Sequence, residues 1–246
     1  VWSNSMISMA RAICIIPARL ESSRFPNKIL TDIQGMPMFE RVYHIAQVSG
    51  VFSAVFIASP NPEILELCEQ RGIAAIATSF DHPCGSSRVF EAARSVQQDW
   101  DIVVNLQADQ PFLPTSYLKT VVEAVGANPI ATIAYEEAGE KDEHTVKVIR
   151  NKKGEGVYFS RYPIPYSVPG TSEVVRLCHL GLYAYKKEFA LSYEGDFKSA
   201  LALQESLEQL DFIHHGYKID VAIVPHSVPE VNVPEDLVLA RGLGLL

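Results

Sequence analysis

The sequence lacks the short motifs that mark the commonest nucleotide-binding and metal-binding proteins. No GxGxxG follows the first apolar segment and no GxxxxGK[ST] occurs, which excludes a dinucleotide-binding fingerprint and a P-loop. The four cysteines, at positions 14, 68, 84 and 178, show neither a CxxC pair nor zinc-ligand spacing. Cys14 and Cys68 lie on apolar periodicity, and we interpret them as core thiols of a reducing compartment.

Positive charge and long apolar runs are also scarce. Lys and Arg number 21 against 29 Asp and Glu, and the resulting net charge of −8 argues against a nucleic-acid surface. No window approaches the ~18 continuous apolar residues of a membrane span, so we expect no membrane insertion. Residues 1–10 lack the basic and apolar regions of a signal peptide, and we interpret them as a loose tail of a cytoplasmic protein.

Short apolar runs and amphipathic segments alternate through the first half of the chain. The apolar runs predict strands at 12–16, 54–58, 73–77, 102–106 and 130–135. The amphipathic segments predict helices at 37–49, 63–71, 87–97 and 115–125. This alternation predicts an α/β fold in which helices cover both faces of a mostly parallel, twisted sheet.

Beyond residue 136 the pattern changes. It predicts a hairpin at 145–150 and 156–160, a strand at 177–185, a helix at 201–214, a strand at 218–224 and a closing helix from residue 235. We interpret residues 11–246 as a single domain with an α+β insertion at about 140–200.

The loop after the first predicted strand concentrates cations in an otherwise acidic chain. Arg19, Arg24 and Lys28 fall within ten residues, and Glu21 is the one carboxylate among them. Guanidinium groups fork onto phosphate oxygens and an ammonium adds a point charge. The loop therefore favours a site for an anion with several charges, although a solvated basic loop would have the same composition.

Other polar residues are expected at the same edge of the sheet. Ligands of open α/β sheets bind beyond the carboxyl ends of the strands, where this chain has the loops 17–28, 59–62, 78–88 and 107–114. Asp109 follows a buried strand, and Mg²⁺ usually takes one or two carboxylates together with substrate phosphate oxygens. The combination predicts a site for Mg²⁺ and a triphosphate. The alternative is that Asp109 is only a turn residue before Pro111.

Six segments occur in one order along the chain: PARLESSRFPNK, NLQADQP, VYFSRYPIP, CHLGLYAY, LQESLEQL and VNVPEDL. From about residue 12 to residue 240 the chain resembles the 3-deoxy-manno-octulosonate (Kdo) cytidylyltransferases, also called CMP-Kdo synthetases. The resemblance implies a nucleotide-diphospho-sugar transferase-like variant of the Rossmann fold. It also implies transfer of CMP from CTP to the anomeric hydroxyl of Kdo, an acidic octulosonate sugar, with Mg²⁺ and release of pyrophosphate, for lipopolysaccharide synthesis. A homodimer is implied as well, and we expect the insertion to form the sugar site and the dimer surface.

The resemblance also implies roles for individual residues. Arg19, Arg24 and Lys28 match triphosphate-binding cations, with Arg19, Lys28 and the metal ligand Asp109 as the catalytic set. Arg88 matches the loop that reads cytosine, and Gln107 matches a residue near the sugar and the α-phosphate. The positions that line the Kdo pocket in the family are Arg161, His179, Tyr183, Glu208 and Gln209. Without the resemblance, Tyr183 reads as core, His179 as a satisfied buried imidazole, and the last two as a solvated helix face.

Several residues depart from the family pattern. Asn232 stands where the second Mg²⁺ ligand is expected to be aspartate, so an oxygen donor is kept and a charge is lost. Ser87 replaces a glutamate of the cytosine loop, Pro60 replaces an aspartate, and Asn27 replaces the glycine before the lysine, which we expect to alter that turn. The departures leave two alternatives open: a weakened or non-catalytic homologue that binds nucleotide or sugar acid, and a nucleotidyltransferase for another sugar acid. Gln110 stands where glutamate is common in the family, and members that have glutamine at this position favour an 8-amino form of Kdo.

Overall fold

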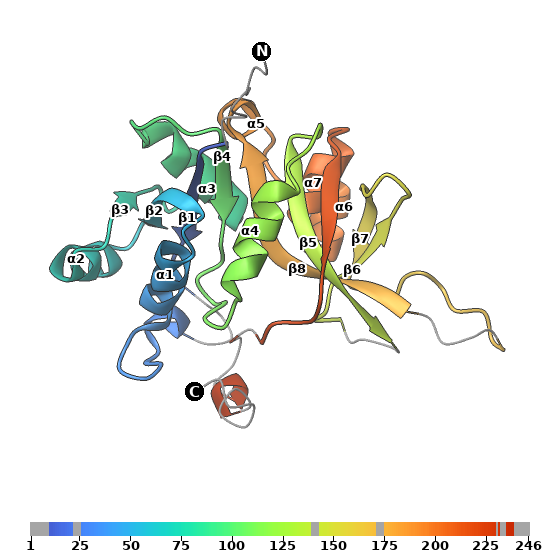
Figure 1. The fold of residues 1–246 in the computed structure, drawn as a ribbon, viewed down its shortest axis with the longest axis horizontal. Helices are drawn as coiled ribbons and strands as arrows, with labels where there is room; N and C mark the ends of the chain where they lie inside the picture. The colour runs from blue at the N-terminus through green and yellow to red at the C-terminus, as the bar shows by residue number, and fades with distance from the viewer. Residues whose placement is uncertain are drawn as a thin grey trace, which may run out of the picture.

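Among the residues that the structure describes, the strands form one nine-stranded sheet, and seven of them follow in the order β3-β2-β1-β4-β8-β5-β9 (Figure 1). The computed structural model describes residues 10–21, 26–138, 143–170, 175–229, 231 and 235–238. The strands are β1 (Ala12–Pro17), β2 (Phe52–Ser59), β3 (Ala75–Ala77), β4 (Ile102–Asn105), β5 (Ile130–Ala138), β6 (Lys147–Arg150), β7 (Gly156–Ser160), β8 (Val175–Lys186) and β9 (Ile219–Val224).

The sheet is mostly parallel, as predicted, but its centre is antiparallel. Strand β1 runs parallel to β2 and β4, β2 runs parallel to β3, and β5 runs parallel to β9. Strand β8, which we had placed with the insertion, lies between β4 and β5 and is antiparallel to both. The far end of β8 pairs with β6, which forms the predicted hairpin with β7. Because Asn105 pairs with Tyr183, residues of β8 lie beside the carboxyl end of β4.

Helices cover both faces of the sheet, as predicted. Alternate residues of β1 point to opposite faces, so that Cys14 packs in one core with Phe39 while Ile13 packs in the other with Phe90. Figure 1 shows α1 and α4 in front of the sheet. The first core includes residues of α1 (Met38–Val48), α2 (Pro62–Arg71) and α4 (Thr115–Glu123). The second includes residues of α3 (Gly85–Ser95), α5 (Lys187–Ser192), α6 (Ala200–Glu205) and α7 (Gln209–His214).

The prediction of one continuous helix at 201–214 was wrong. Helix α6 ends at Glu205, and Ser206 adopts a left-handed conformation with φ of 53°. Leu207 N then donates to Ala202 O at 3.1 Å, which closes the end of α6. Apolar spacing continues through this break because Leu207 and Leu210 pack in the same core, so periodicity alone could not reveal it. The break frees Glu208 from the solvated helix face that the spacing suggested.

Within the ranges that the structure describes, no helix has the length and apolar content of a membrane span. The four cysteines are free thiols. Cys14 and Cys68 are buried in the first core, and burial raises the pKa of Cys68 to about 11. At neutral pH the Cys68 side chain is therefore an apolar thiol rather than a nucleophilic thiolate.

Candidate active site

A cleft of ≈ 690 Å³ lies where the loop after β4, the start of α3, strand β8 and the α6–α7 junction meet. These segments are distant in the sequence, and the antiparallel insertion of β8 brings them together. Seven of the residues predicted to form the site line this cleft: Gln107, Asp109, Arg161, His179, Tyr183, Glu208 and Gln209.

Lys28 and Asp109 form an ion pair between the cationic loop and the end of β4. Lys28 Nζ lies 2.7 Å from Asp109 Oδ2, and the two side chains are 14% and 27% exposed. Lys28 begins a short 3₁₀ helix, η1 (Lys28–Leu30). Because the pair is partly shielded from water, its attraction exceeds that of a surface pair. The structure thus places the two groups predicted to contact phosphate and metal next to each other.

Asn27 adopts a left-handed conformation before η1, with φ of 56°. Glycine enters this region most readily, and asparagine enters it more readily than other residues with a β-carbon. Asparagine is therefore compatible with a glycine-type turn before Lys28. The replacement of glycine gives no reason to expect the altered turn that the sequence suggested.

The three arginines predicted at the nucleotide end are placed differently. Arg19 is exposed on the loop after β1, and Arg24 lies outside the described residues. Arg88 is 3% exposed and does not line the cleft. Burial lowers the pKa of Arg88, and the nearby charge of Arg19 lowers it further. Arg19 and Arg88 therefore lie near one another. A contact of Arg88 with cytosine stays a prediction.

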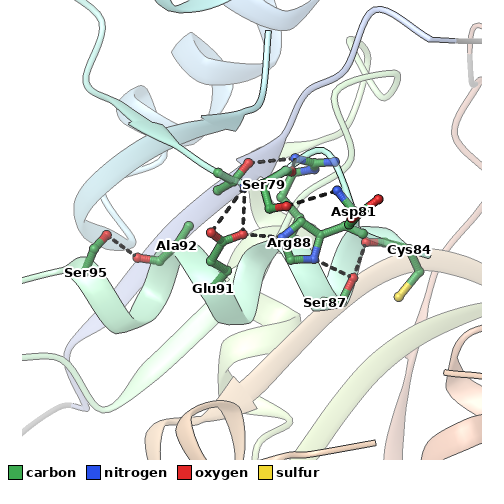
Figure 2. Close-up of polar contacts among 10 residues, drawn as sticks. Ser79, Asp81, Cys84, Ser87, Arg88, Glu91, Ala92 and Ser95 are labelled. Atoms are coloured by element: carbon green, nitrogen blue, oxygen red, sulfur yellow. Dashed lines mark hydrogen bonds and ion pairs between the residues drawn. The ribbon is translucent and has the colours of Figure 1, made fainter. Parts of the chain in front are cut away.

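A polar network joins the loop before α3 to the body of that helix (Figure 2). Arg88 Nη1 donates to Thr78 Oγ1 at 2.6 Å and to Ser79 O at 2.8 Å. Glu91, one turn along the helix, accepts from Ser79 N at 3.0 Å and contacts His82 Nε2. The positively charged Arg88 and the negatively charged Glu91 thus both bind residues 78–82. These contacts fix the backbone of the loop before α3. Sequence analysis missed Glu91, although its position one turn after Arg88 on a helix is a detectable signal.

Two other departures, Ser87 and Pro60, lie at the start of α3 and directly after β2. Ser87 Oγ donates to Cys84 O at 2.9 Å and lies 3.1 Å from His82 Nδ1, so it supports the first turn of α3 (Figure 2). Pro60 follows the last residue of β2 and is buried.

Arg161 is held in the cleft wall by neutral groups. Its Nε donates to Glu205 O at 2.8 Å, its Nη1 to Glu143 O at 3.1 Å and its Nη2 to Ser206 O at 3.3 Å. The Glu205 carboxylate accepts from the backbone N of Arg161 at 2.9 Å rather than from its guanidinium. Among the described residues, no carboxylate forms an ion pair with this guanidinium, so its charge is oriented and not neutralised.

His179 is a neutral group in this site. Burial lowers its pKa to about 3. Thr132 Oγ1 lies 2.8 Å from His179 Nε2 and donates its own hydrogen to Leu182 O at 2.7 Å. Since a hydroxyl has one hydrogen, His179 Nε2 must donate to Thr132. Its Nδ1 is therefore left as an acceptor, the form that suits a hydroxyl of a ligand.

Tyr183 and Gln209 leave one buried donor without a partner. Tyr183 OH donates to Gln209 Oε1 at 3.0 Å, and both residues are buried in the wall of the cleft. Gln209 Nε2 has no hydrogen-bond partner among the described residues. An unmade hydrogen bond of a buried donor costs about 1–3 kcal/mol. This donor is therefore a position where a ligand oxygen would be favoured.

Glu208 meets the first turn of α3. Its carboxylate accepts from Ser86 N at 3.2 Å and from Ser86 Oγ at 2.8 Å. A carboxylate at a helix N-terminus satisfies free N–H groups and interacts favourably with the helix dipole. Glu208 thus links the α6–α7 junction to the start of α3. Sequence analysis missed Ser86, because a serine near a helix start is common.

The side-chain oxygens of the cleft offer part of the ligand set that Mg²⁺ needs. Asp109 and Asp236 line the same cleft, but the described residues contain no group of three or more metal-binding side chains. Mg²⁺ does not need such a group, since it binds through one or two carboxylates, waters and substrate phosphates. Val231 N donates to Asp109 O at 3.2 Å, which joins the last segment of the chain to the loop after β4. The predicted ligand Asn232 lies outside the described residues.

Comparisons with known proteins agree with this geometry. A family model described as "Cytidylyltransferase" matches residues 13–219. The 3-deoxy-manno-octulosonate cytidylyltransferase of Polynucleobacter asymbioticus is 38% identical over 242 residues, which are 94% of each chain. That of Chlorobium luteolum is 37% identical over 245 residues, covering 94% of this chain and 96% of the relative.

A solved structure of CMP:2-keto-3-deoxy-manno-octonic acid synthetase complexed with CTP superposes with a TM-score of 0.86. It is 33% identical to this chain, and the match covers 96% of this chain and 99% of the solved one. A 4-diphosphocytidyl-2C-methyl-D-erythritol synthase from Anaerococcus prevotii, 14% identical with a TM-score of 0.62, shares the fold alone. The predicted nucleotide-diphospho-sugar transferase-like fold is thereby confirmed.

Proposed function

This chain belongs to the cytidylyltransferase family, and we propose that it transfers CMP from CTP to the anomeric hydroxyl of Kdo or a close analogue. The observation that supports this substrate is the Arg161 guanidinium, fixed by three carbonyl oxygens in a cleft that also holds the unpartnered donor of Gln209. A fixed, un-neutralised cation beside a buried donor and a neutral acceptor suits an acidic sugar with several hydroxyls.

The reaction needs charge stabilisation at the phosphates more than it needs acid–base chemistry. The oxygen of the anomeric hydroxyl forms a bond to the α-phosphorus of CTP, the bond from this phosphorus to the bridging oxygen of pyrophosphate breaks, and the hydroxyl proton passes to the released pyrophosphate or to water. Charge moves onto the leaving pyrophosphate, where Lys28 and, in keeping with the family resemblance, Arg24 would neutralise it. Preorganised cations of this kind act without reorganisation at the moment of reaction. The Lys28–Asp109 pair keeps the lysine in place before the nucleotide binds.

The sugar is held by groups of complementary type. The Arg161 guanidinium would accept the carboxylate, and Gln209 Nε2 would donate to a sugar oxygen. His179 Nδ1 would accept from a hydroxyl, because a pKa of about 3 keeps this imidazole neutral. These contacts orient the anomeric hydroxyl toward Gln107 and the α-phosphate.

Mg²⁺ is part of this proposal. Asp109 would be its carboxylate ligand, with Asn232 as a neutral oxygen donor in keeping with the family resemblance. The metal would neutralise phosphate oxygens of CTP. Titration calorimetry of CTP binding tests this role without turnover: we expect CTP to bind more tightly with Mg²⁺ than with EDTA, and Asp109→Asn to remove the difference.

A homodimer in the cytoplasm completes the proposal. Large apolar side chains are exposed on and after the β6–β7 hairpin, including Val157, Tyr162 at 75% and Tyr166 at 77%. Exposed aromatic side chains of this kind are enriched in subunit interfaces. Sedimentation should give twice the chain mass, and Tyr162→Ser with Tyr166→Ser should shift the equilibrium toward monomer. An unchanged dimer would place the interface elsewhere.

The activity is tested by pyrophosphate release with CTP and Mg²⁺. We expect release that requires a sugar acid, and separate assays with Kdo and 8-amino-Kdo identify the acceptor. CTP binding without release with either sugar would instead support the weakened homologue. A thermal-shift panel of nucleotides tests the base: a ligand at 100 times its Kd stabilises by about 2.7 kcal/mol, and CTP should give the largest shift.

A further inference from the structure

A chain of buried hydrogen bonds connects Glu208 to Gln107 through residues that no substrate is expected to touch. Ser86 Oγ lies 2.8 Å from Glu208 Oε1, 2.6 Å from Tyr185 OH and 3.2 Å from Asn105 Nδ2. Asn105 Oδ1 in turn accepts from Gln107 Nε2 at 2.9 Å. Ser86, Asn105 and Tyr185 are fully buried, whereas Glu208 and Gln107 line the cleft. The chain therefore begins and ends in the site but runs beneath it.

The chemistry of Glu208 sets the direction of every bond in this chain. An ionised carboxylate only accepts hydrogen bonds, so the single hydrogen of Ser86 Oγ is donated to Glu208. Ser86 Oγ must then accept from both Tyr185 OH and Asn105. The Asn105 amide is thus oriented with Nδ2 toward Ser86 and Oδ1 toward Gln107. Gln107 has to present Nε2 to Asn105, which leaves its Oε1 for the substrate.

Gly85 provides the space for this orientation. A β-carbon at Gly85 would lie 3.1 Å from Gln107 Nε2 and 3.4 Å from Gln107 Oε1. Contacts as short as 3.1 Å would push the amide away, so the absence of a side chain lets the amide lie against the start of α3. The orientation of Gln107 thus has steric as well as hydrogen-bonding support.

We propose that Ser86 is a positioning residue that acts through Asn105 to hold Gln107 Oε1 toward the cleft as an acceptor for a hydroxyl of the sugar acid. An amide rotated by 180° would place Gln107 Oε1 against the acceptor Asn105 Oδ1, and the sugar hydroxyl would lose the acceptor for its hydrogen, which weakens binding in the reactive geometry. The inference rests on the proposed function for the substrate, but the hydrogen-bond chain itself does not depend on it.

A double-mutant cycle tests whether Ser86 acts through Gln107. The variants are Ser86→Ala, Gln107→Ala and the double variant, with Ser86→Thr as the conservative rescue. Ser95→Ala is the matched control, because Ser95 Oγ donates to Ala92 O on the same helix. We expect Ser86→Ala to lower kcat/KM for the sugar acid about tenfold, or roughly 1.4 kcal/mol, with little change in the KM for CTP. In the Gln107→Ala background the same change should cost less than twofold. Ser86→Thr should recover most of the loss, and Ser95→Ala should show none.

Independent losses that multiply in the double variant would overturn the proposal, as would an unaffected kcat/KM in Ser86→Ala. A fall in Tm without the kinetic coupling would show a structural role only. If Ser86→Ala does not fold, Asn105→Ala breaks the same chain one link later and must show the same coupling.

A second measurement does not depend on turnover. The side-chain amide resonances of Asn105 and Gln107 should shift and exchange faster in Ser86→Ala, but not in Ser95→Ala. Unchanged resonances would overturn the proposal even if the wild-type chain proved inactive. Inactive wild-type protein with the expected amide changes would refute the proposed function and leave the hydrogen-bond chain standing.

Discussion

Replacing Arg161 with methionine tests the sugar end of the cleft most sharply. The change removes the guanidinium while keeping a long side chain, so the space in the cleft wall stays largely filled. Three backbone carbonyls lose their donor, namely those of Glu143, Glu205 and Ser206. Hydrogen bonds to charged groups contribute about 1.5–3 kcal/mol each. Loss of one such contact to the substrate carboxylate therefore predicts a roughly 10- to 100-fold higher KM for the sugar acid.

The KM for CTP should change far less, because the contacts that Arg161 makes with described residues lie outside the cationic loop. Arg150→Met is the matched control: Arg150 Nε also donates to a backbone carbonyl, that of Val221 at 2.7 Å, but Arg150 does not line the cleft. Steady-state kinetics should also be measured with the carboxamide of the sugar acid. Wild-type enzyme should strongly prefer the acid, and Arg161→Met should not. An unchanged KM for the acid, or a retained preference, would refute the assignment of Arg161 to the carboxylate.

Three further predictions concern single residues. Lys28→Met should raise the Kd for CTP several-fold in calorimetry, since a cation beside Asp109 is lost; unchanged affinity would remove Lys28 from the phosphate site. Asn27→Val should lower the free energy of unfolding in urea by about 1–2 kcal/mol, because φ is 56° there, whereas Asn27→Gly should be nearly neutral; equal effects would contradict the strain argument. Burial lowers the pKa of His179 from 6.5 to about 3, so the unfolded chain binds more protons between these values, and the stability that His179 contributes is full above pH 6.5 and falls toward pH 3. At pH 5 this loss is about 2 kcal/mol, and Tm profiles should show it in wild-type protein but not in His179→Gln.

The sequence was sufficient for the parallel strands of the first half of the chain and for several of the residues that line the cleft. Apolar strands such as β1 and β4 end in polar loops, and ligands of such sheets bind at the strand ends. This rule predicted Lys28 and Asp109 at one edge of the sheet, where they form an ion pair. The position of β8 could not be predicted in this way. Its alternation marks a strand, but no local signal states that a strand from the second half of the chain pairs between β4 and β5.

The remaining differences have the same physical origin. Ser206 breaks the predicted helix with a left-handed residue, while Leu207 and Leu210 keep the apolar spacing of an unbroken one. Asn105 falls inside the strand predicted at 102–106 and drew no separate prediction, yet it is a link in a buried hydrogen-bond chain. Such roles depend on specific side-chain and backbone partners, which periodicity and composition do not encode.

Phosphorus NMR of CTP and Mg²⁺ with the enzyme, before and after addition of Kdo, tests the central claim most directly. The account predicts that the triphosphate signals persist without sugar and that Kdo converts them to pyrophosphate and one new phosphodiester signal in equal amounts. Intact CTP in the presence of bound Kdo, or hydrolysis of CTP that needs no sugar, would contradict it.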